Sequence, residues 1–353
     1  MSGVGWEAPG CATIDAMPHD DSSRLPRVVL LGTGGTIAGE GAAAATTGAG
    51  SAAYQAAVVT VERLIAQVPG LDRLAHLAAE QLFQIDSADF TDARLLQLAH
   101  RVAALCQQDD VDAVVVTHGT DTLQESAYFL HLTVPTRKSV VLTGSMRPGT
   151  AVSADGPANL LHAVAVAADP SSAGRGVLVV MNEQVHSGRD VVKTHSQRVD
   201  AFASPHGPLG LVVEGVTRWY RVPERPHTAG SGFDIGRIDA LPRVGVVASH
   251  GDMRREIYDA WVALGARAIV HAGFGGGTVP DSLKAPLAEL RAHGVLLVRA
   301  SRTGGPLARG ADDDAHGWVV ADDQSATHAR LLAALALTES ADPAVIQRLF
   351  WRY

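Results

Sequence analysis

The sequence predicts an α/β protein with two domains, a large amino-terminal one and a smaller carboxy-terminal one, each with a mostly parallel sheet flanked by helices. Its 353 residues are too many for a domain with one ordinary hydrophobic core and too few for three domains. Hydrophobic residues make up 46% of the chain, enough for large cores. Short apolar runs alternate with helical spacing on both sides of a stretch without periodicity, and this alternation is typical of parallel sheets with helical crossovers.

The amino-terminal domain is expected over residues 27–216. Continuous apolar, mostly β-branched runs there predict strands at 28–31, 113–116, 140–142 and 177–180. Such runs are typical of parallel strands buried on both faces. Residues 60–68 and 122–132 have helical spacing and supply the crossovers.

Residues 217–243 are rich in Pro, Arg, His, Gly and Ser, and they predict a linker. The second domain is expected over residues 244–353, with strands at 244–247, 268–270 and 295–298 and helices at 253–264, 286–293, 327–337 and 343–349. Residues 1–26 have neither a basic start nor an apolar stretch of secretory type. We expect a disordered tail there.

The charge balance argues against a nucleic-acid partner. The formal net charge is −8, with dispersed Lys and Arg, whereas phosphate binding needs a dense basic face. No apolar run is long enough to span a bilayer, so no membrane partner is expected. The two cysteines, Cys11 and Cys106, exclude a disulfide scaffold and fit a reducing, cytoplasmic compartment. The 15 histidines show no ligand spacing, so neither a metal nor an organic cofactor is expected.

The first candidate loop follows the first strand and reads Gly-Thr-Gly-Gly-Thr-Ile-Ala-Gly over residues 32–39. A dinucleotide fingerprint starting at Gly32 would need glycine at Ile37, and no P-loop lysine follows. Thr36 places a hydroxyl among backbone amides at a strand end, as a nucleophile beside an oxyanion hole requires. A tight turn with a capping threonine explains the loop alone equally well.

The second candidate loop, Thr-His-Gly-Thr-Asp-Thr over residues 117–122, lies between a strongly apolar strand and a helical stretch. A helix N-terminus there favours a substrate carboxylate. Simple helix capping by Thr120, Asp121 and Thr122 is the alternative, and His118 is expected to be structural.

Both loops resemble the two signature motifs of bacterial-type L-asparaginases and glutaminase-asparaginases. The likeness continues through residues 144–148, 153–157, 181–182 and 188–194 and, beyond the linker, through residues 301–302 to the terminal helices. It covers residues 27–353, and it implies the two-domain asparaginase-like fold and hydrolysis of the side-chain amide of L-asparagine to L-aspartate and ammonia.

The resemblance also implies catalytic roles. Thr36 matches the nucleophile that forms an acyl-enzyme ester, and Tyr54 matches a lid tyrosine that helps to activate it. Thr120, Asp121 and Lys193 match a second catalytic group, in which Lys193 lowers the pKa of the Thr120 hydroxyl or deprotonates it. The lid before Tyr54 is longer here than in the family, and a packing aromatic is the alternative for that residue.

Further positions match substrate contacts of the family. Ser87 matches a residue that binds the α-carboxylate, and Ser145 matches the position whose carbonyl contacts the amide nitrogen. The implied substrate-binding positions are Gly35, Ser87, Ala88, Gly119, Thr120, Asp121 and Ser145.

Three departures fall near the substrate's α-amino group. Many members of the family have Gln where this chain has Ala88. The Asn and Glu that a neighbouring subunit usually contributes are not clearly retained in segments 275–278 and 310–314. Asp86 or one of Asp312 to Asp314 is a candidate replacement, and a solvated acidic loop is the alternative for that run.

The family implies a homo-oligomer, a dimer or tetramer, with sites at the subunit interfaces. The main rival function is the same threonine chemistry on glutamine or on another short carboxamide that lacks a free α-amino group. An ammonia-supplying amidotransferase subunit and a catalytically silent binding module are both disfavoured, the latter by intact Thr36, Thr120, Asp121 and Lys193.

Overall fold

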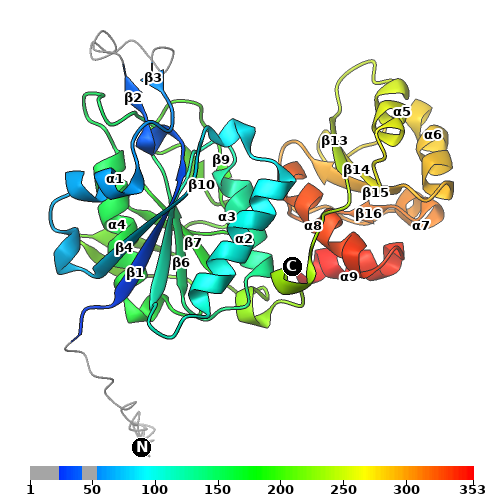
Figure 1. The fold of residues 1–353 in the computed structure, drawn as a ribbon. Coiled ribbons are helices and arrows are strands. Elements are labelled where there is room, and N and C mark those ends of the chain that lie inside the picture. Colours follow the sequence, from blue (N-terminus) through cyan, green and yellow to red (C-terminus); the bar gives the residue numbers. More distant parts are fainter. Residues whose placement is uncertain (1–23, 42–53) are drawn as a thin grey trace, which may run out of the picture.

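A computed structural model describes residues 24–41 and 54–353. The chain forms two α/β parts, and both are drawn in Figure 1. Most of the predicted tail lies outside the described residues, as does Cys11. No helix in the described part of the chain is both long and apolar enough to cross a membrane.

The large part is built on one eight-stranded sheet. In spatial order its strands are β12 (Val216–Trp219), β11 (Gly210–Val213), β8 (Gln184–Ser187), β7 (Val177–Met181), β6 (Ser139–Thr143), β5 (Ala113–Thr117), β1 (Arg27–Gly34) and β4 (His76–Ile85). The five from β7 to β4 pair in parallel, and β8, β11 and β12 add antiparallel pairs. The predicted linker therefore begins inside β12, and its exact bounds stay a prediction.

Helices cover both faces of this sheet because its strands are apolar on both sides. Val29 and Leu31 of β1 belong to the core under α2 (Asp92–Cys106) and α3 (Leu123–Thr133). Val28 and Leu30 belong to the opposite core, under α1 (Val61–Gln67) and α4 (Gly156–Ala168). Side chains that alternate along a strand point to opposite faces, so each continuous apolar run fills both cores.

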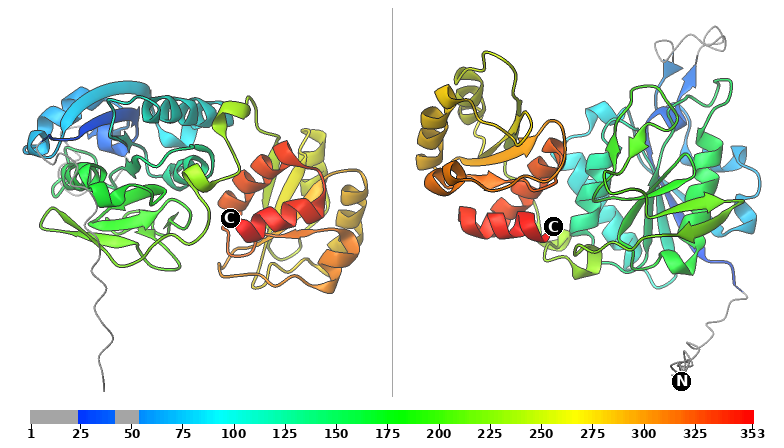
Figure 2. Two further views of the ribbon diagram at one scale, coloured as in Figure 1. Left: turned by 90° about the horizontal axis from the view of Figure 1, so that it is seen from below. Right: turned by 180° about the vertical axis from the view of Figure 1, so that it is seen from behind.

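The small part has a parallel sheet in the order β13 (Val244–Ala248), β14 (Ala268–Gly273), β15 (Leu296–Ser301) and β16 (Val319–Val320). Its helices are α5 (Glu256–Ala263), α6 (Asp281–Ala292), α7 (Ala311–His316), α8 (Ala326–Glu339) and α9 (Pro343–Arg352). Helix α8 lies on the side that faces α2 and α3 (Figures 1 and 2), and its buried residues belong to the same apolar cluster as theirs. The predicted fold class is confirmed.

The order of the strands fixes where a ligand site belongs. From β1 the chain crosses to β4 on one side and then returns to β5 on the other. Open parallel sheets bind ligands at the carboxyl ends of the strands where the direction of winding reverses. That point lies here between β1 and β5, the two strands that carry the predicted loops.

Candidate active site

The loops after β1 and β5 touch through their glycines. Gly35 has φ +79°, and a Cβ on it would lie 2.2 Å from the Cα of Gly119. Glycine is therefore required by both the backbone conformation and the space. The Thr33 hydroxyl donates a hydrogen bond of 2.9 Å to the Thr117 carbonyl and adds a second link between the loops. Thr36 and Thr120, which follow the two glycines, are thus brought to the same end of the sheet.

Thr36 is the first residue of a short 3-10 helix, Thr36–Ala38. It is half-buried, between the fully buried glycines before it and the buried Ile37 after it. The amide of Gly39 donates to the Thr36 carbonyl at 2.9 Å and closes the turn. The backbone that carries the predicted nucleophile is therefore held by local hydrogen bonds.

Thr120, Asp121 and Lys193 form one hydrogen-bonded group. The Lys193 ammonium lies 2.9 Å from Thr120 Oγ1 and 2.6 Å from Asp121 Oδ1. The side chain of Lys193 is 18% exposed and that of Asp121 is 59% exposed, so only the Thr120 side of the group is buried. The structure brings together three residues that lie on the β5–α3 loop and on β9 (Val192–Lys193), which pairs with β10 (Phe202–Ala203).

Ser87 lies against the same loop. It is buried in a short 3-10 helix, Ser87–Asp89, and its Oγ accepts a hydrogen bond from the Asp121 amide at 3.2 Å. A Cβ on Gly119 would lie 2.5 Å from Ser87 Oγ, so Gly119 is tightly enclosed between Gly35 and Ser87. Ala88 is exposed, and its amide donates to the Asp86 carboxylate at 3.0 Å.

The loop after β6 joins this arrangement. Ser145 is fully buried and donates from Oγ to the Arg147 carbonyl at 2.8 Å. A Cβ on the preceding residue, Gly144, would lie 2.5 Å from the His118 carbonyl oxygen. The ends of three neighbouring strands, β1, β5 and β6, therefore carry the predicted residues to one region.

His118 is structural in its surroundings. Its Nδ1 lies 2.8 Å from the Gly119 carbonyl, its Nε2 lies 2.9 Å from Ser126 Oγ, and its ring packs on Phe90. Burial lowers the pKa of His118 to about 4. The neutral imidazole has a hydrogen-bond partner at each ring nitrogen, and it stabilises the loop that carries Thr120.

Comparison with known proteins decides the family. Residues 27–225 match the family model described as Asparaginase, N-terminal, and residues 243–350 match that of the Glutaminase/Asparaginase C-terminal domain. The chain belongs to the asparaginase family.

Individual relatives agree with this assignment. The chain is 50% identical to a glutaminase-asparaginase of Pseudomonas aeruginosa over 94% of this chain and 91% of the relative. It is 41% identical to a probable periplasmic L-asparaginase of Haemophilus influenzae over 94% of each chain. The crystal structure of a probable cytoplasmic L-asparaginase from Campylobacter jejuni superposes with a TM-score of 0.89, at 40% identity, over 93% of this chain and all of that one.

The segment that the resemblance matches to a lid is described only at its ends. Glu40–Gly41 (β2) pairs with Tyr54–Gln55 (β3), with Gly41 opposite Tyr54. The Tyr54 side chain and residues 42–53 lie outside the described part of the chain. The role of Tyr54 in activating Thr36 therefore stays a prediction.

The acidic run 312–314 was expected to be either a replacement ligand for the substrate ammonium or a solvated loop, and the structure differs from both. It lies in α7, and each carboxylate has a cation of its own chain within reach: Lys284 at 2.9 Å from Asp312, Arg299 at 2.6 Å from Asp313, and Arg309 at 2.6 Å from Asp314. The solvated loop is wrong for Asp313, which is 1% exposed, accepts two hydrogen bonds from Arg299 and accepts the Gly310 amide at 2.7 Å. These intrachain partners weaken the case for the run as a replacement ligand for a substrate ammonium.

Two residues near Lys193 were missed from the sequence. Gln124 Oε1 accepts a hydrogen bond from the Lys193 backbone amide at 2.7 Å, and Arg189 lies four positions before Lys193 on the same segment. No local signal predicts the contact of Gln124, because its partner lies 69 positions away.

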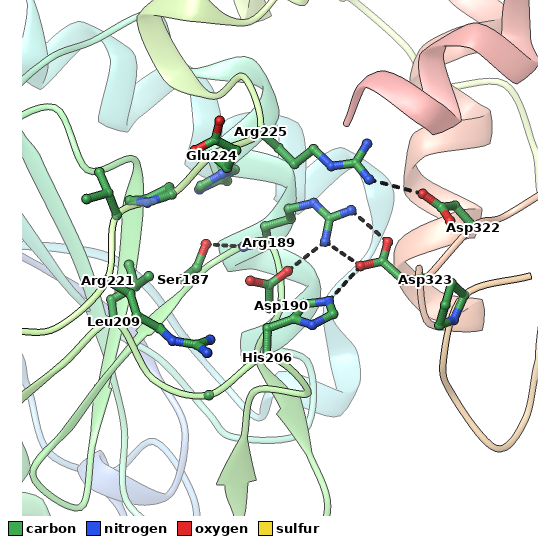
Figure 3. Close-up of a pocket in the computed structure, with 15 residues that line it drawn as sticks. Ser187, Arg189, Asp190, His206, Leu209, Arg221, Glu224, Arg225, Asp322 and Asp323 are labelled. Atoms are coloured by element: carbon green, nitrogen blue, oxygen red, sulfur yellow. Dashed lines mark hydrogen bonds and ion pairs between the residues drawn. The ribbon is translucent and has the colours of Figure 1, made fainter.

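Arg189 lines a cavity of about 370 Å³ between the two parts of the molecule, shown in Figure 3. Its guanidinium lies 2.7 Å from Asp190 and 2.7 Å from Asp323, and His206 bonds Asp323 at 2.9 Å. Asp190, His206 and Asp323 have ligand atoms within 4.8 Å of one another, the spacing of a metal site. The Arg189 guanidinium is already paired with both carboxylates, so the cluster is a link between the domains.

Proposed function

We propose that this chain is an amidohydrolase that converts the side-chain amide of L-asparagine to L-aspartate and ammonia. Membership of the asparaginase family supports the reaction class. The observation that carries the proposal is the position of Lys193 Nζ, 2.9 Å from Thr120 Oγ1 and 2.6 Å from Asp121 Oδ1. The loop of Thr120 and Asp121 packs against the loop of Thr36 through Gly119 and Gly35. Hydroxyl groups, an amine and water suffice for the chemistry.

In the proposed mechanism, Thr36 Oγ1 attacks the amide carbon and its proton passes to the departing nitrogen, which leaves as ammonia. The acyl ester on Thr36 is then cleaved by water, whose proton returns to Thr36 as aspartate is released. Tyr54 is the proposed activator of Thr36. Thr120, Asp121 and Lys193 form the second proton-handling group, and backbone amides of the Gly-rich loop face the developing oxyanion.

The proposed substrate contacts surround this group. Ser87 and the amino end of α3 bind the α-carboxylate, which a helix N-terminus favours. Asp121 binds the α-ammonium, and the carbonyl of Ser145 accepts from the amide nitrogen. Gly35 and Gly119 keep the loops close enough for these groups to converge.

Glutamine or another short carboxamide that lacks a free α-amino group is the alternative substrate, and Ala88 is the observation that favours the latter. An exposed alanine offers no side-chain contact where Gln is usual, so Asp121 becomes the main partner of the ammonium. A short carboxamide without the amino group, such as succinamate, would then lose less than it does in a tighter site.

Ammonia release from asparagine, glutamine and succinamate tests this choice. We expect asparagine to give the highest kcat/KM and succinamate to be turned over more slowly. Equal kcat/KM for asparagine and succinamate would remove Asp121 from ammonium recognition. No release from any of the three amides would overturn the proposed function.

Substitution tests the assigned hydroxyls. Thr36→Ala and Thr120→Val should each lower kcat by at least about 10⁴-fold, because the reacting or proton-handling oxygen is lost. Thr143→Val is the control: it removes a buried hydroxyl that bonds the Val180 carbonyl at 2.8 Å at the end of β6, outside the proposed machinery. We expect this variant to keep most of its activity and to lose about 1 kcal/mol of stability. Turnover close to wild type in Thr36→Ala would exclude that residue as the nucleophile.

Assembly and compartment complete the proposal. We place the protein in the cytoplasm as a homo-oligomer, a dimer or tetramer, with its sites at the subunit interfaces, as the family resemblance implies. Cell fractionation tests the compartment, and recovery of the protein in a periplasmic extract would contradict the cytoplasmic location. Light scattering checks the assembly.

A further inference from the structure

We propose that Gln124 is a positioning residue through which the carboxy-terminal domain of the same chain holds Lys193. The inference rests on the proposed function in that Lys193 takes part in catalysis. Its basis is a chain of two hydrogen bonds: Gln124 Oε1 accepts from the Lys193 amide at 2.7 Å, and Gln124 Nε2 donates to Thr327 Oγ1 at 3.0 Å. One side-chain amide therefore joins the segment of the candidate base to α8.

The direction of both bonds is fixed by chemistry. A backbone N–H only donates, so the Gln124 oxygen must face Lys193 and the NH₂ group must face Thr327. A flipped amide would place its NH₂ group against the Lys193 N–H and break that bond, although the Thr327 hydroxyl can donate as well as accept. Because Gln124 lies in the first turn of α3, its backbone is also close to Thr120 and Asp121, which hold the Lys193 ammonium. The residue thus fixes the Lys193 backbone relative to the groups that meet its side chain.

Thr327 is itself well anchored. It lies in the first turn of α8, and its hydroxyl is 3.1 Å from that of Ser325, which caps the helix by accepting the His328 amide at 3.2 Å. Arg330 of α8 adds ion pairs of 3.0 Å with Asp92 and with Glu125. The end of α8 that Gln124 contacts is therefore held against α2 and α3.

The same domain holds the Lys193 segment at a second point. Asp323 lies just before α8 and binds the Arg189 guanidinium at 2.7 Å, four positions before Lys193. Figure 3 shows Arg189 between Asp190 and Asp323, with dashed lines to both. A segment fixed at Arg189 and at Lys193 by one domain follows any movement of that domain, and an error of about 1 Å at a reacting group costs about 10²-fold in rate.

The test compares Gln124→Leu, Thr327→Val and Thr327→Ser. We expect Gln124→Leu to lower kcat about 10- to 100-fold with KM within about threefold, and to shift the limb of the pH–rate profile that belongs to the second catalytic group. Thr327→Val should show the same pattern with a smaller loss, and Thr327→Ser should restore kcat because it keeps the hydroxyl. The double variant Gln124→Leu/Thr327→Val should be no worse than Gln124→Leu, since both changes break one pathway.

Glu125→Gln is the matched control. Glu125 lies next to Gln124 in α3, and its substitution weakens one ion pair of Arg330 while the pair of Arg330 with Asp92 and both hydrogen bonds of Gln124 remain. We expect it to lower the melting temperature and to leave kcat and the pH profile unchanged. Wild-type kcat and pH profile in Gln124→Leu would overturn the proposal. So would a loss of kcat in Glu125→Gln as large as that in Gln124→Leu.

A readout without turnover separates this inference from the proposed function. Amide hydrogen exchange of the peptide over residues 187–194 should be faster in Gln124→Leu and Thr327→Val than in wild type and Glu125→Gln, because the Lys193 N–H loses its acceptor. If the wild type hydrolyses no amide, the proposed function fails and the exchange data alone decide whether Gln124 positions Lys193. Unchanged exchange in both variants would overturn the positioning role.

Discussion

At the scale of single residues, Gly35 shows how the site depends on the absence of a side chain. Its left-handed backbone requires glycine, and its close contact with Gly119 requires glycine independently. Gly70 has the left-handed backbone without the close contact, so it serves as a comparison. Gly70 has φ +88°, and a Cβ there would meet nothing within 4 Å.

We predict that Gly70→Ala lowers the free energy of unfolding by about 1–2 kcal/mol, the cost of a left-handed non-glycine residue, and leaves activity intact. Gly35→Ala adds the clash with Gly119, so it should cost more stability than Gly70→Ala and lower kcat at least about 100-fold. Urea unfolding and ammonia release measure the two effects. Equal stability losses in the two variants would mean that the loops separate without cost.

Single residues also mark the limit of what the sequence predicts. Thr36 and Thr120 follow strand ends, as the apolar runs before them led us to expect, because strand ends and loops are local features. Ser87 and Lys193 were matched through the family resemblance, and their roles stay predictions. Gln124, Arg189 and Asp323 were not predicted, since their roles come from contacts between distant segments. The Tyr54 side chain lies outside the described residues, so its role still rests on the resemblance.

At the scale of elements, apolar β-branched runs predicted strands such as β1, β5, β13 and β14 closely. Helix α6 was predicted over residues 286–293, but it begins at Asp281. Pro286 is tolerated inside the helix because its missing N–H would have bonded the carbonyl of Ser282, an exposed residue. Helix α7 was not predicted, since its three consecutive aspartates suggested a solvated loop.

The buried ion pair of α7 gives an element-scale prediction. Asp313→Ala removes two hydrogen bonds from Arg299, whose side chain is 12% exposed, and also the cap on Gly310. We expect a loss of about 3–5 kcal/mol, because an unpaired charge stays buried. Asp314→Ala should cost less than about 1 kcal/mol, because the Asp314 side chain is 71% exposed. Chemical unfolding of both variants checks the difference, and equal losses would contradict the structural role of Asp313.

At the scale of the whole molecule, buried histidines make stability depend on pH. Burial lowers the pKa of His118 and His186 to about 4 and that of His328 to about 3, and it lowers the pKa of His131 well below its usual value. Their pKa values in the unfolded chain are about 6.5, so the unfolded state binds more protons as the pH falls below that value. The stability from these neutral rings is complete above pH 6.5 and is lost as the pH falls toward about 4.

We therefore predict that the melting temperature falls between pH 7 and pH 5, with each of these histidines contributing a slope of up to about 1.4 kcal/mol per pH unit. His186→Gln should flatten the slope. His100→Gln, at an exposed position of α2, should leave it unchanged. A melting temperature that stays constant from pH 7 to pH 5 would contradict the neutral burial of these rings.

The apolar cluster shared by α3 and α8 also bears on biosynthesis. Gln124 and Thr327 are separated by 203 positions, so the ribosome synthesises α3 long before α8, the helix that packs against it. At roughly 5–20 residues per second, the α3 surface waits on the order of 10 to 40 seconds for α8. During that interval the nascent chain exposes an apolar face, which makes it a client for chaperones until translation delivers the second half.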